Sequence, residues 1–450
     1  MALLEVENLT VNFYTADGVV KAVDNLTYRV DRGEMFGVVG ESGAGKSVTA
    51  LSLLRLIESP GQIESGHIRF EDPDTVESFK EEFEEHVVDL AALRAEHDLQ
   101  RIAEDLQTMG VRPDALAGDA ADGDSDLVEL AARDEFDLAD VVGRGYAADL
   151  GLVNDEAFII EDGSRQYLEV LQAPERAVRM LRGNNVAMIF QDAQTALNPV
   201  YSVGEQIAEA IRHHLDYTDE EAKKRTIQLL DRVGIPEAEI RDADYPHEFS
   251  GGMQQRVVIA MALSCNPDLL VCDEPTTALD VTIEAKILDL ITELAEDFDT
   301  AVQLITHDLG VIAETCDRVM VMYAGRPVEK ADVEELFYDP KHPYTVGLMS
   351  SIPRIGDNRE RLQTIPGTMP DLVELPPGCS FHPRCPFAEE TCTRHEPPLV
   401  DPETGEPVTS ADDSRGAACL AYTGELDGTL EYSVDIEGEL TGAPSSRGDD

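Results

Sequence analysis

Tryptophan is absent from this 450-residue sequence, and aromatic residues make up only 6% of it. Proteins that bind single-stranded nucleic acid stack bases on aromatic side chains, so this composition argues against such a platform. The sequence contains no apolar run long enough to predict a transmembrane helix, which needs about 18 residues or more. Residues 1–7 have neither a basic start nor a long apolar stretch, so we expect no signal peptide and a cytosolic protein.

Basic residues are scarce: 35 lysines and arginines stand against 90 aspartates and glutamates, a formal net charge of −55. Such a surface repels phosphate backbones and anionic headgroups, which argues against general nucleic-acid or membrane-surface binding. Only 8 of the basic residues are lysines, whereas hydrophobic residues reach 42%. This composition is typical of a folded protein from a high-salt, halophilic cytoplasm, where salt screens the self-repulsion. The alternative, disorder, conflicts with the ordered motifs described below.

The order of apolar segments predicts an α/β fold. Residues 3–11 and 22–30 alternate as half-buried strands do, and residues 35–39 are a short apolar run typical of a buried parallel strand. A glycine-rich turn and a helix at residues 48–57 follow, which is the order that a phosphate-binding unit requires. Further strands alternate with helical segments and so indicate a parallel sheet covered by helices. We predict them at residues 186–190, 269–272, 301–305 and 318–323.

Changes of composition divide the chain. Residues 1–335 hold the predicted ATPase domain, interrupted at residues 72–175 by an acidic, partly helical insertion. Within the insertion, residues 114–126 are typical of a flexible acidic loop. Residues 336–425 form a second region rich in proline and cysteine, and residues 426–450 are predicted to be disordered. Apolar residues at helical spacing predict one helix early in the insertion: Val76, Phe79, Phe83, Val87 and Leu90.

A complete GxxxxGK(S/T) loop follows the strand at residues 35–39. Its glycines let backbone N–H groups approach phosphates, its lysine reaches the β- and γ-phosphates, and its serine hydroxyl takes a Mg²⁺ position. We therefore expect nucleotide binding by the loop and the residue after it, namely Gly40, Glu41, Ser42, Gly43, Ala44, Gly45, Lys46, Ser47 and Val48.

A second motif adds the groups needed for hydrolysis. The apolar strand at residues 269–272 delivers Asp273 to the Mg²⁺ shell at its carboxyl end, beside Ser47, and places Glu274 to polarise the attacking water. Glu274 and Lys46 are thus candidate catalytic residues. The two motifs together predict hydrolysis rather than binding alone.

A third motif lies between them, at residues 249–253, Phe-Ser-Gly-Gly-Met. Ser250, Gly251 and Gly252 open a helix and so make a second anion site. Here the chain resembles the ATP-binding-cassette (ABC) ATPases, whose signature is usually written LSGGQ. The resemblance implies ATP and Mg²⁺ as cofactors, and a signature that caps ATP held by an opposing subunit. Phe249 and Met253 depart from that signature but leave Ser250 and Gly252, so capping is expected to survive.

Further positions match the family in order. By resemblance, Gln191 is the Q-loop glutamine that senses Mg²⁺ and the membrane partner, and Asp280 lies in the D-loop across the dimer interface. His307 resembles the switch histidine that contacts the γ-phosphate and is a third candidate catalytic residue. Tyr14, or alternatively Phe13, occupies the position where the family stacks an aromatic ring on adenine. A lone His or Gln is more often structural, but five motifs in register favour an ABC ATPase.

Other segments resemble the oligopeptide/dipeptide (and nickel) importer subfamily. The resemblance implies a second ABC ATPase subunit, expected to be a paralogue, two transmembrane permease subunits and an extracellular solute-binding protein. The chain would then lie peripherally at the cytoplasmic face of the membrane. A nickel or other small-solute importer, or a soluble non-transport ABC ATPase, are alternatives. The matching segments are residues 193–199, 342–345, 347–353, 365–370 and 375–386.

Four of the seven cysteines crowd into the last fifth of the chain, which in a reducing compartment suggests a metal centre rather than disulfides. Their spacing is not that of a zinc ribbon, so an iron–sulfur cluster of the 4Fe-4S type is favoured, as the subfamily resemblance also implies. Free thiols and zinc remain alternatives. The candidate ligands are Cys379, Cys385, Cys392 and Cys419, whereas Cys265, Cys272 and Cys316 lie on apolar segments and are expected in the core.

Overall fold

The computed structural model describes residues 1–117, 121, 125–133, 135–191, 193–276, 281–350, 365–408, 410–411, 415–426 and 430. Four of the predictions therefore fall outside the described residues in whole or in part. These are Asp280, part of the acidic loop at 114–126, part of the importer-like segment at 347–353, and most of the tail at 426–450.

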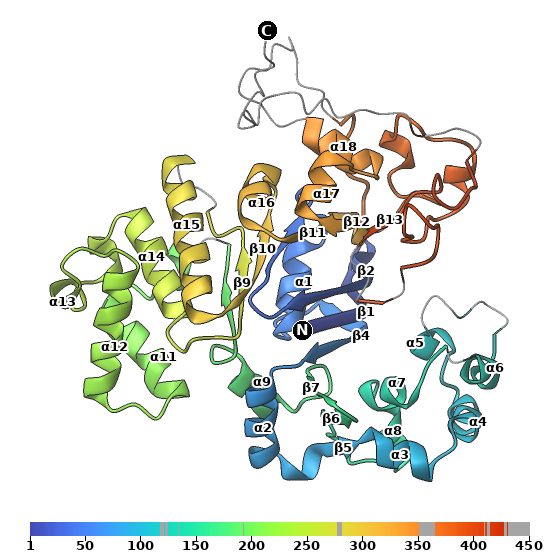
Figure 1. Ribbon diagram of the computed structural model, residues 1–450, viewed down its shortest axis with the longest axis horizontal. Coiled ribbons are helices and arrows are strands. Elements are labelled where there is room, and N and C mark those ends of the chain that lie inside the picture. The colour runs from blue at the N-terminus through green and yellow to red at the C-terminus, as the bar shows by residue number, and fades with distance from the viewer. Residues whose placement is uncertain are drawn as a thin grey trace, which may run out of the picture.

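A seven-stranded sheet lies at the centre of the molecule, in the order β13-β12-β11-β3-β10-β9-β8 (Figure 1). Its five strands from β11 to β8 run parallel, whereas β12 and β13 are antiparallel additions at one edge. The predicted parallel strands are confirmed, each to within one residue at either end. The bounds are β3 (Met35–Val39), β8 (Val186–Ile189), β9 (Leu269–Asp273), β10 (Ala301–Thr306), β11 (Arg318–Tyr323), β12 (Arg326–Asp332) and β13 (Gly416–Ala417).

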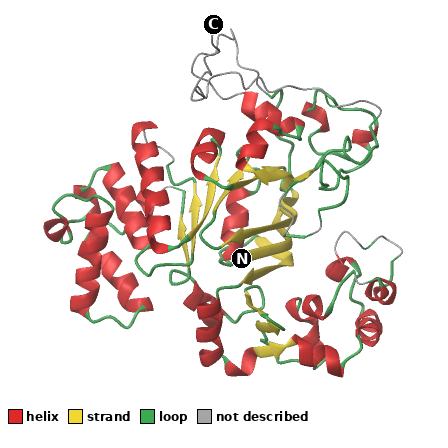
Figure 2. Ribbon diagram, viewed as in Figure 1, coloured by secondary structure: helices red, strands yellow, loops and turns green. Residues whose placement is uncertain are grey.

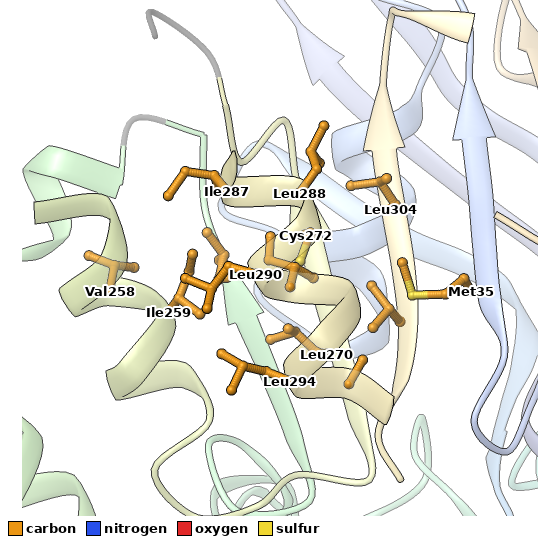
Figure 3. Packing of buried hydrophobic residues seen from close by; sticks show 14 of the residues in the cluster. Met35, Val258, Ile259, Leu270, Cys272, Ile287, Leu288, Leu290, Leu294 and Leu304 are labelled. Atoms are coloured by element: carbon orange, nitrogen blue, oxygen red, sulfur yellow. The ribbon is translucent and has the colours of Figure 1, made fainter. Parts of the chain in front are cut away.

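The largest core lies between strands β9 and β10 and two helices, α14 (Gly251–Ala262) and α15 (Val281–Phe298) (Figure 3). Leu270 from the sheet, Ile259 from α14 and Leu294 from α15 each have at most 2% of their surface exposed. Burying one such side chain contributes about 1.5–3 kcal/mol, so this core fixes the sheet edge on which β9 ends.

A lobe of helices extends the core away from the sheet, at the left of Figure 1. It contains α10 (Ala193–Ala196), α11 (Val203–His214), α12 (Asp219–Arg232) and α13 (Ala238–Arg241), together with α14. Ser202 and Thr218 begin α11 and α12 as N-caps, since each side chain accepts a hydrogen bond from a backbone N–H of the first turn. The lobe presents the beginning of α14 to solvent, because Ser250 is exposed there.

A second sheet of six strands, β2-β1-β4-β7-β6-β5, crosses the first and shares a core with it and with α1 (Lys46–Leu53). The strands predicted at residues 3–11 and 22–30 are confirmed and are longer than expected. The helix predicted at residues 48–57 is confirmed, although α1 begins and ends earlier. The strands are β1 (Ala2–Thr15), β2 (Gly18–Asp31), β4 (Gly61–Phe70), β5 (Val87–Asp89), β6 (Ile159–Asp162) and β7 (Arg165–Glu169).

The insertion at residues 72–175 supplies three strands of that sheet and has a hydrophobic core of its own. Figure 2 shows its short helices grouped around these strands. They are α2 (Pro73–Glu82), the 3-10 turn η1 (Glu84–His86), α3 (Leu90–Glu96), α4 (Leu99–Met109), α5 (Asp114–Ala117), α6 (Leu127–Ala132), α7 (Leu138–Gly143), α8 (Tyr146–Asp149) and, at its end, α9 (Glu175–Leu181).

The helix predicted at Val76, Phe79, Phe83, Val87 and Leu90 is confirmed only in its first part, because α2 ends at Glu82. The chain leaves the helical conformation at Phe83, whose ring packs on Phe79 and Phe158. Residues 87–89 then pair in parallel with β6 instead of continuing the helix. Strand pairing therefore decides the conformation here, although the apolar residues have helical spacing. Val87 and Val88 favour this outcome, because β-branched residues form strands more readily than helices.

Two helices, α16 (Leu309–Thr315) and α17 (Val333–Tyr338), lie against the central sheet before the C-terminal region. That region contains α18 (Pro343–Ser350), η4 (His382–Arg384) and η5 (Thr391–Thr393) and otherwise consists mainly of loops. The last strand, β13, pairs with β12 and so ties the region to the edge of the sheet. No helix among the described residues is both long and apolar enough to span a bilayer.

Candidate nucleotide-binding site

The phosphate loop joins the fully buried strand β3 to α1, and its tight path requires glycine at two positions. Gly45 has a φ of +102°, and a Cβ there would lie 2.3 Å from the backbone oxygen of Ala22. A Cβ at Gly40 would lie 2.3 Å from the backbone oxygen of Met322. Because backbone atoms on both sides leave no room for a side chain, the loop can take this path only with glycine.

Lys46, the first residue of α1, is buried and turns its ammonium group back onto the loop. Its Nζ donates to the carbonyl oxygens of Gly40 at 2.9 Å and Glu41 at 3.2 Å. Burial lowers the pKa of Lys46, and the carboxylates of Glu274 and Asp273 act in the opposite direction. The lysine charge is thus held inside the loop and close to two acids, as phosphate binding requires.

The serine of the loop meets the end of strand β9. Ser47 Oγ donates to Asp273 Oδ1 at 3.1 Å. Burial raises the pKa of Asp273, the Ser47 hydrogen bond lowers it, and the neighbouring Glu274 raises it further. A hydroxyl and a carboxylate at this separation are a ligand pair that suits Mg²⁺, which prefers oxygen donors.

The carboxylate of Glu274, the residue after β9, is contacted by two side chains that follow the ends of other strands. Gln191 Nε2, after β8, donates to Glu274 Oε2 at 3.1 Å, and His307 Nδ1, after β10, lies 3.3 Å from Oε1. Glu274 has a φ of +45°, a conformation that is uncommon and strained for a residue other than glycine. Its backbone N–H donates to Ile305 at 2.9 Å, which holds that conformation in place.

The structure therefore brings together most of the residues that the motifs single out. The loop of residues 40–47, Asp273, Glu274, Gln191 and His307 meet at the carboxyl ends of β3, β9, β8 and β10. Ligands of open parallel sheets bind at this edge, because the loops that follow the strands converge there.

Two predicted elements lie apart from this cluster. Ser250 is the N-cap of α14, its hydroxyl makes no capping hydrogen bond, and α14 and α1 lie on opposite sides of β9 and β10 in Figure 1. Tyr14 has 46% of its surface exposed and donates to Glu64 at 2.8 Å. It lines a cavity of about 800 Å³ that is bounded by β1, β2 and β4 and by residues of the insertion such as Ala115 and Tyr146, and that none of residues 40–47 lines. Phe13, the alternative, packs into the core instead.

The four C-terminal cysteines line one small, enclosed cavity of about 20 Å³, which is room for about one water molecule. Burial raises the pKa of Cys379 to about 11 and that of Cys419 to about 12. Cys379 N–H donates to the Cys392 carbonyl at 2.9 Å, which joins two of the loops. Among the described residues, no three His, Cys, Asp or Glu side chains are arranged to hold a metal ion.

The other cysteines behave as predicted. Cys272 is fully buried in β9, Cys265 is 7% exposed, and Cys316 packs partly buried against the same core. Burial raises the pKa of Cys316 to about 12, so its thiol stays protonated. These three thiols are packing residues.

The sequence reasoning missed three contacts that the C-terminal region makes with the phosphate loop. Arg384 pairs with Glu41, the Tyr344 hydroxyl accepts the Glu41 backbone N–H, and Met369 lies against Gly43. The partners are more than 300 residues apart in sequence, and neither periodicity nor motif spacing reports such a distance.

A phosphate loop after a central parallel strand, with an acid-ended strand beside it and a glycine-opened helix in a separate lobe, defines the class of nucleotide-binding cassettes. The family profile described as "ABC transporter" matches residues 23–136 and 165–277, and the profile "Oligopeptide/dipeptide transporter, C-terminal region" matches residues 328–392. The chain therefore belongs to the ABC transporter family, as an ATP-hydrolysing ATP-binding subunit of the oligopeptide/dipeptide transporter group.

Two relatives by sequence agree with this assignment. The oligopeptide transport ATP-binding protein OppD of Haemophilus influenzae is 39% identical over 390 residues, which cover 87% of this chain and 91% of the relative. AppD of Bacillus subtilis, also an oligopeptide transport ATP-binding protein, is 38% identical over 407 residues, covering 90% and 95%. Among solved structures, cbiO1 of Clostridium perfringens, part of the ABC transporter complex cbiONQ, aligns with a TM-score of 0.47 at 20% identity, covering 75% and 91%.

Proposed function

We propose that the chain hydrolyses MgATP to power the import of di- and oligopeptides. The observation that carries this proposal is the convergence of three strand ends on Glu274, through Gln191 and His307, beside the Ser47–Asp273 pair. The names of the relatives, which are oligopeptide transport proteins, support peptides as the cargo.

Each side chain of the cluster has a proposed role. Lys46 binds the β- and γ-phosphates, and Ser47, Asp273 and Gln191 take part in the Mg²⁺ shell. Glu274 accepts a proton from the attacking water, and His307 contacts the γ-phosphate. The hydrogen bonds to Glu274 support this assignment, because they aim its carboxylate and leave a polar group on either side of it.

The signature at Ser250, Gly251 and Gly252 is proposed to cap ATP held by a second ATPase subunit. The exposure of Ser250 supports this role, and so does the position of α14 and α1 on opposite sides of β9 and β10 (Figure 1). The second subunit would be a paralogue. Asp280, outside the described residues, would lie at the same interface, and Tyr14 would stack on adenine.

The remaining partners follow from the peptide-import proposal. Two transmembrane permease subunits would receive the motion of the ATPase pair, and an extracellular solute-binding protein would deliver peptide. The chain would then act as a peripheral protein at the cytoplasmic face of the membrane. Neither nucleic acid nor a free anionic surface is a proposed partner, because the net charge of −55 opposes both.

The domain plan is also proposed: an ATPase domain at residues 1–335, with its insertion at 72–175, a C-terminal domain at 336–425 and a tail at 426–450. The separate hydrophobic core of the insertion supports treating it as a folded unit. The excess of acidic residues supports a halophilic origin.

An iron–sulfur cluster at Cys379, Cys385, Cys392 and Cys419 is proposed for the C-terminal domain. The cavity that all four cysteines line supports it, because a cluster needs the four thiolates to face one space. The thiols would have to spread to admit it. Anaerobically purified protein should then contain iron and absorb visible light broadly, whereas colourless, iron-free protein would rule the cluster out.

The function itself is tested by reconstitution. The chain, co-purified with its permeases and second ATPase in proteoliposomes, should accumulate labelled oligopeptide only with MgATP and binding protein present. Lys46→Ala should abolish uptake without loss of complex assembly. Uptake of nickel in place of peptide, or ATP hydrolysis with no transported solute, would contradict peptide import.

A further inference from the structure

We infer that Arg384 of the C-terminal region is a positioning residue for the phosphate loop and acts through Glu41. The inference rests on the proposed function, because it concerns how ATP enters the loop of residues 40–47. It makes the C-terminal region part of the nucleotide site rather than a separate attachment.

The guanidinium of Arg384 binds the carboxylate of Glu41 through both of its terminal nitrogens. Nη1 donates to Glu41 Oε2 at 3.1 Å, and Nη2 lies 3.1 Å from Oε1, so the pair is bidentate. The arginine is itself fixed, since Nε donates to the Pro366 carbonyl at 2.9 Å and Nη1 to the Tyr323 hydroxyl at 3.4 Å. Only 7% of its side chain is exposed. A forked ion pair between a buried arginine and a partly buried carboxylate sets direction as well as distance.

Tyr344 holds the same loop residue by its backbone. The Glu41 N–H donates to the Tyr344 hydroxyl at 3.0 Å, and the Tyr344 ring is fully buried, 4.7 Å from the ring of Tyr323. Side chain and backbone of Glu41 are therefore both bound by groups that lie 300 or more residues later in the chain.

A third contact reaches the middle of the loop. A Cβ built on Gly43 would lie 3.0 Å from Cε of Met369, so this methionine of the C-terminal region packs against the loop. Within the ATPase domain, Lys46 Nζ already holds the carbonyl oxygens of Gly40 and Glu41. The C-terminal region adds contacts of another kind, to the side chain and N–H of Glu41 and to Gly43.

The restraint has a direct consequence for affinity. A loop that is already closed loses less conformational entropy when phosphates bind, and so binds them more tightly. The arginine also neutralises a carboxylate that lies within the phosphate loop. Removal of Arg384 should loosen the loop and leave the Glu41 charge unpaired, and both effects weaken ATP binding. The groups around Glu274 are untouched, so the rate of the chemical step should change little.

The test is a double-mutant cycle on the full-length chain, with KM and kcat for MgATP and the Kd of a fluorescent ATP analogue as readouts. Arg384→Ala should raise KM and Kd about tenfold, which corresponds to about 1.4 kcal/mol, with kcat within twofold of wild type. Glu41→Ala should also weaken binding, and the double variant should bind no worse than Glu41→Ala alone. Arg384→Lys, which keeps the charge but not the fork, should lie between Arg384→Ala and wild type.

The matched control is Arg415→Ala, which removes an arginine of the same region whose acidic partners, Glu335, Asp339 and Glu403, all lie outside the loop of residues 40–47. It should leave KM within twofold. Equal KM shifts for Arg384→Ala and Arg415→Ala, or additive effects of the Arg384 and Glu41 changes, would overturn the inference. Thermal melting separates misfolding from weak binding, and Arg384→Lys decides the case if Arg384→Ala unfolds. Wild-type protein without ATPase activity would defeat the proposed function, whereas active wild-type with unshifted variants defeats this inference alone.

Discussion

Gly45→Ala should distort the phosphate loop and weaken ATP binding, with little effect on the rest of the fold. The new Cβ would lie 2.3 Å from the Ala22 backbone oxygen, and the φ of +102° is one that alanine rarely adopts. The left-handed backbone alone costs about 1–2 kcal/mol. Because a backbone oxygen cannot rotate away as a side chain can, relief of the clash needs the loop or β2 to shift, and a further cost of about 1–3 kcal/mol is expected, as in overpacked cores.

The sum, about 2–5 kcal/mol, opposes the phosphate-binding shape of the loop. If the loop relaxes to another shape instead, ATP affinity falls by about 30-fold or more, since 1.4 kcal/mol corresponds to a factor of ten. The assay is equilibrium binding of a fluorescent ATP analogue, with circular dichroism as a check of folding.

The matched control is Gly163→Ala in the turn between β6 and β7. Gly163 also has a positive φ, +63°, but a Cβ there meets nothing within 4 Å. It carries the backbone strain without the clash, far from the loop in sequence, and should bind ATP as wild type does. Binding by Gly45→Ala within threefold of the control would refute the reasoning that the loop needs glycine here.

Three further predictions follow from the site and its supports. Asp273→Asn should lower the affinity for Mg²⁺ in the presence of ATP at least tenfold, as measured by a metal titration, because it removes the charge beside Ser47. An unchanged Mg²⁺ affinity would contradict the metal assignment. Burial raises the pKa of Glu329 to about 7 from its ordinary 4.5, so this acid favours folding at low pH and that contribution is lost as the pH rises from about 4.5 to about 7. Urea titrations should therefore show Glu329→Gln gaining stability relative to wild type across this window, by up to about 1.4 kcal/mol per pH unit, and a constant difference would contradict it. Gly143→Ala would place a Cβ 2.5 Å from Nδ1 of buried His67 and should lower the thermal midpoint by a few degrees, with KM for ATP unchanged; an unchanged midpoint would show that the insertion yields there.

The sequence predicts the central sheet well, because each parallel strand is buried on both faces and reads as a short apolar run between polar segments. β3 at Met35–Val39 begins and ends where its apolar run does, and β11 at Arg318–Tyr323 is shifted from its apolar run, residues 319–324, by one residue. The site cluster is also readable, since Asp273 ends β9, Glu274 follows it, and Ser47 lies at the start of the helix that follows β3 and its loop.

The insertion defeats such reasoning at Phe83, where pairing with a strand about 70 residues later decides the conformation. Local spacing carries no information about that partner. The ion pair between Arg384 and Glu41 could not be predicted from the sequence for the same reason. The two residues are 343 positions apart, and each belongs to a motif that suggests another role. Ion pairs formed by the folded chain are visible only after the fold is known.

The most direct measurement of the hydrolytic site is the turnover of Glu274→Gln. Glutamine keeps the shape of the side chain and can still accept the hydrogen bond from Gln191, but it cannot take a proton from water. A general base contributes about 10²–10⁴-fold, so kcat should fall at least a hundredfold while MgATP stays bound. Glu293→Gln, an exposed change on α15, is the control and should keep wild-type turnover. Turnover of Glu274→Gln within threefold of that control would contradict hydrolysis at this site.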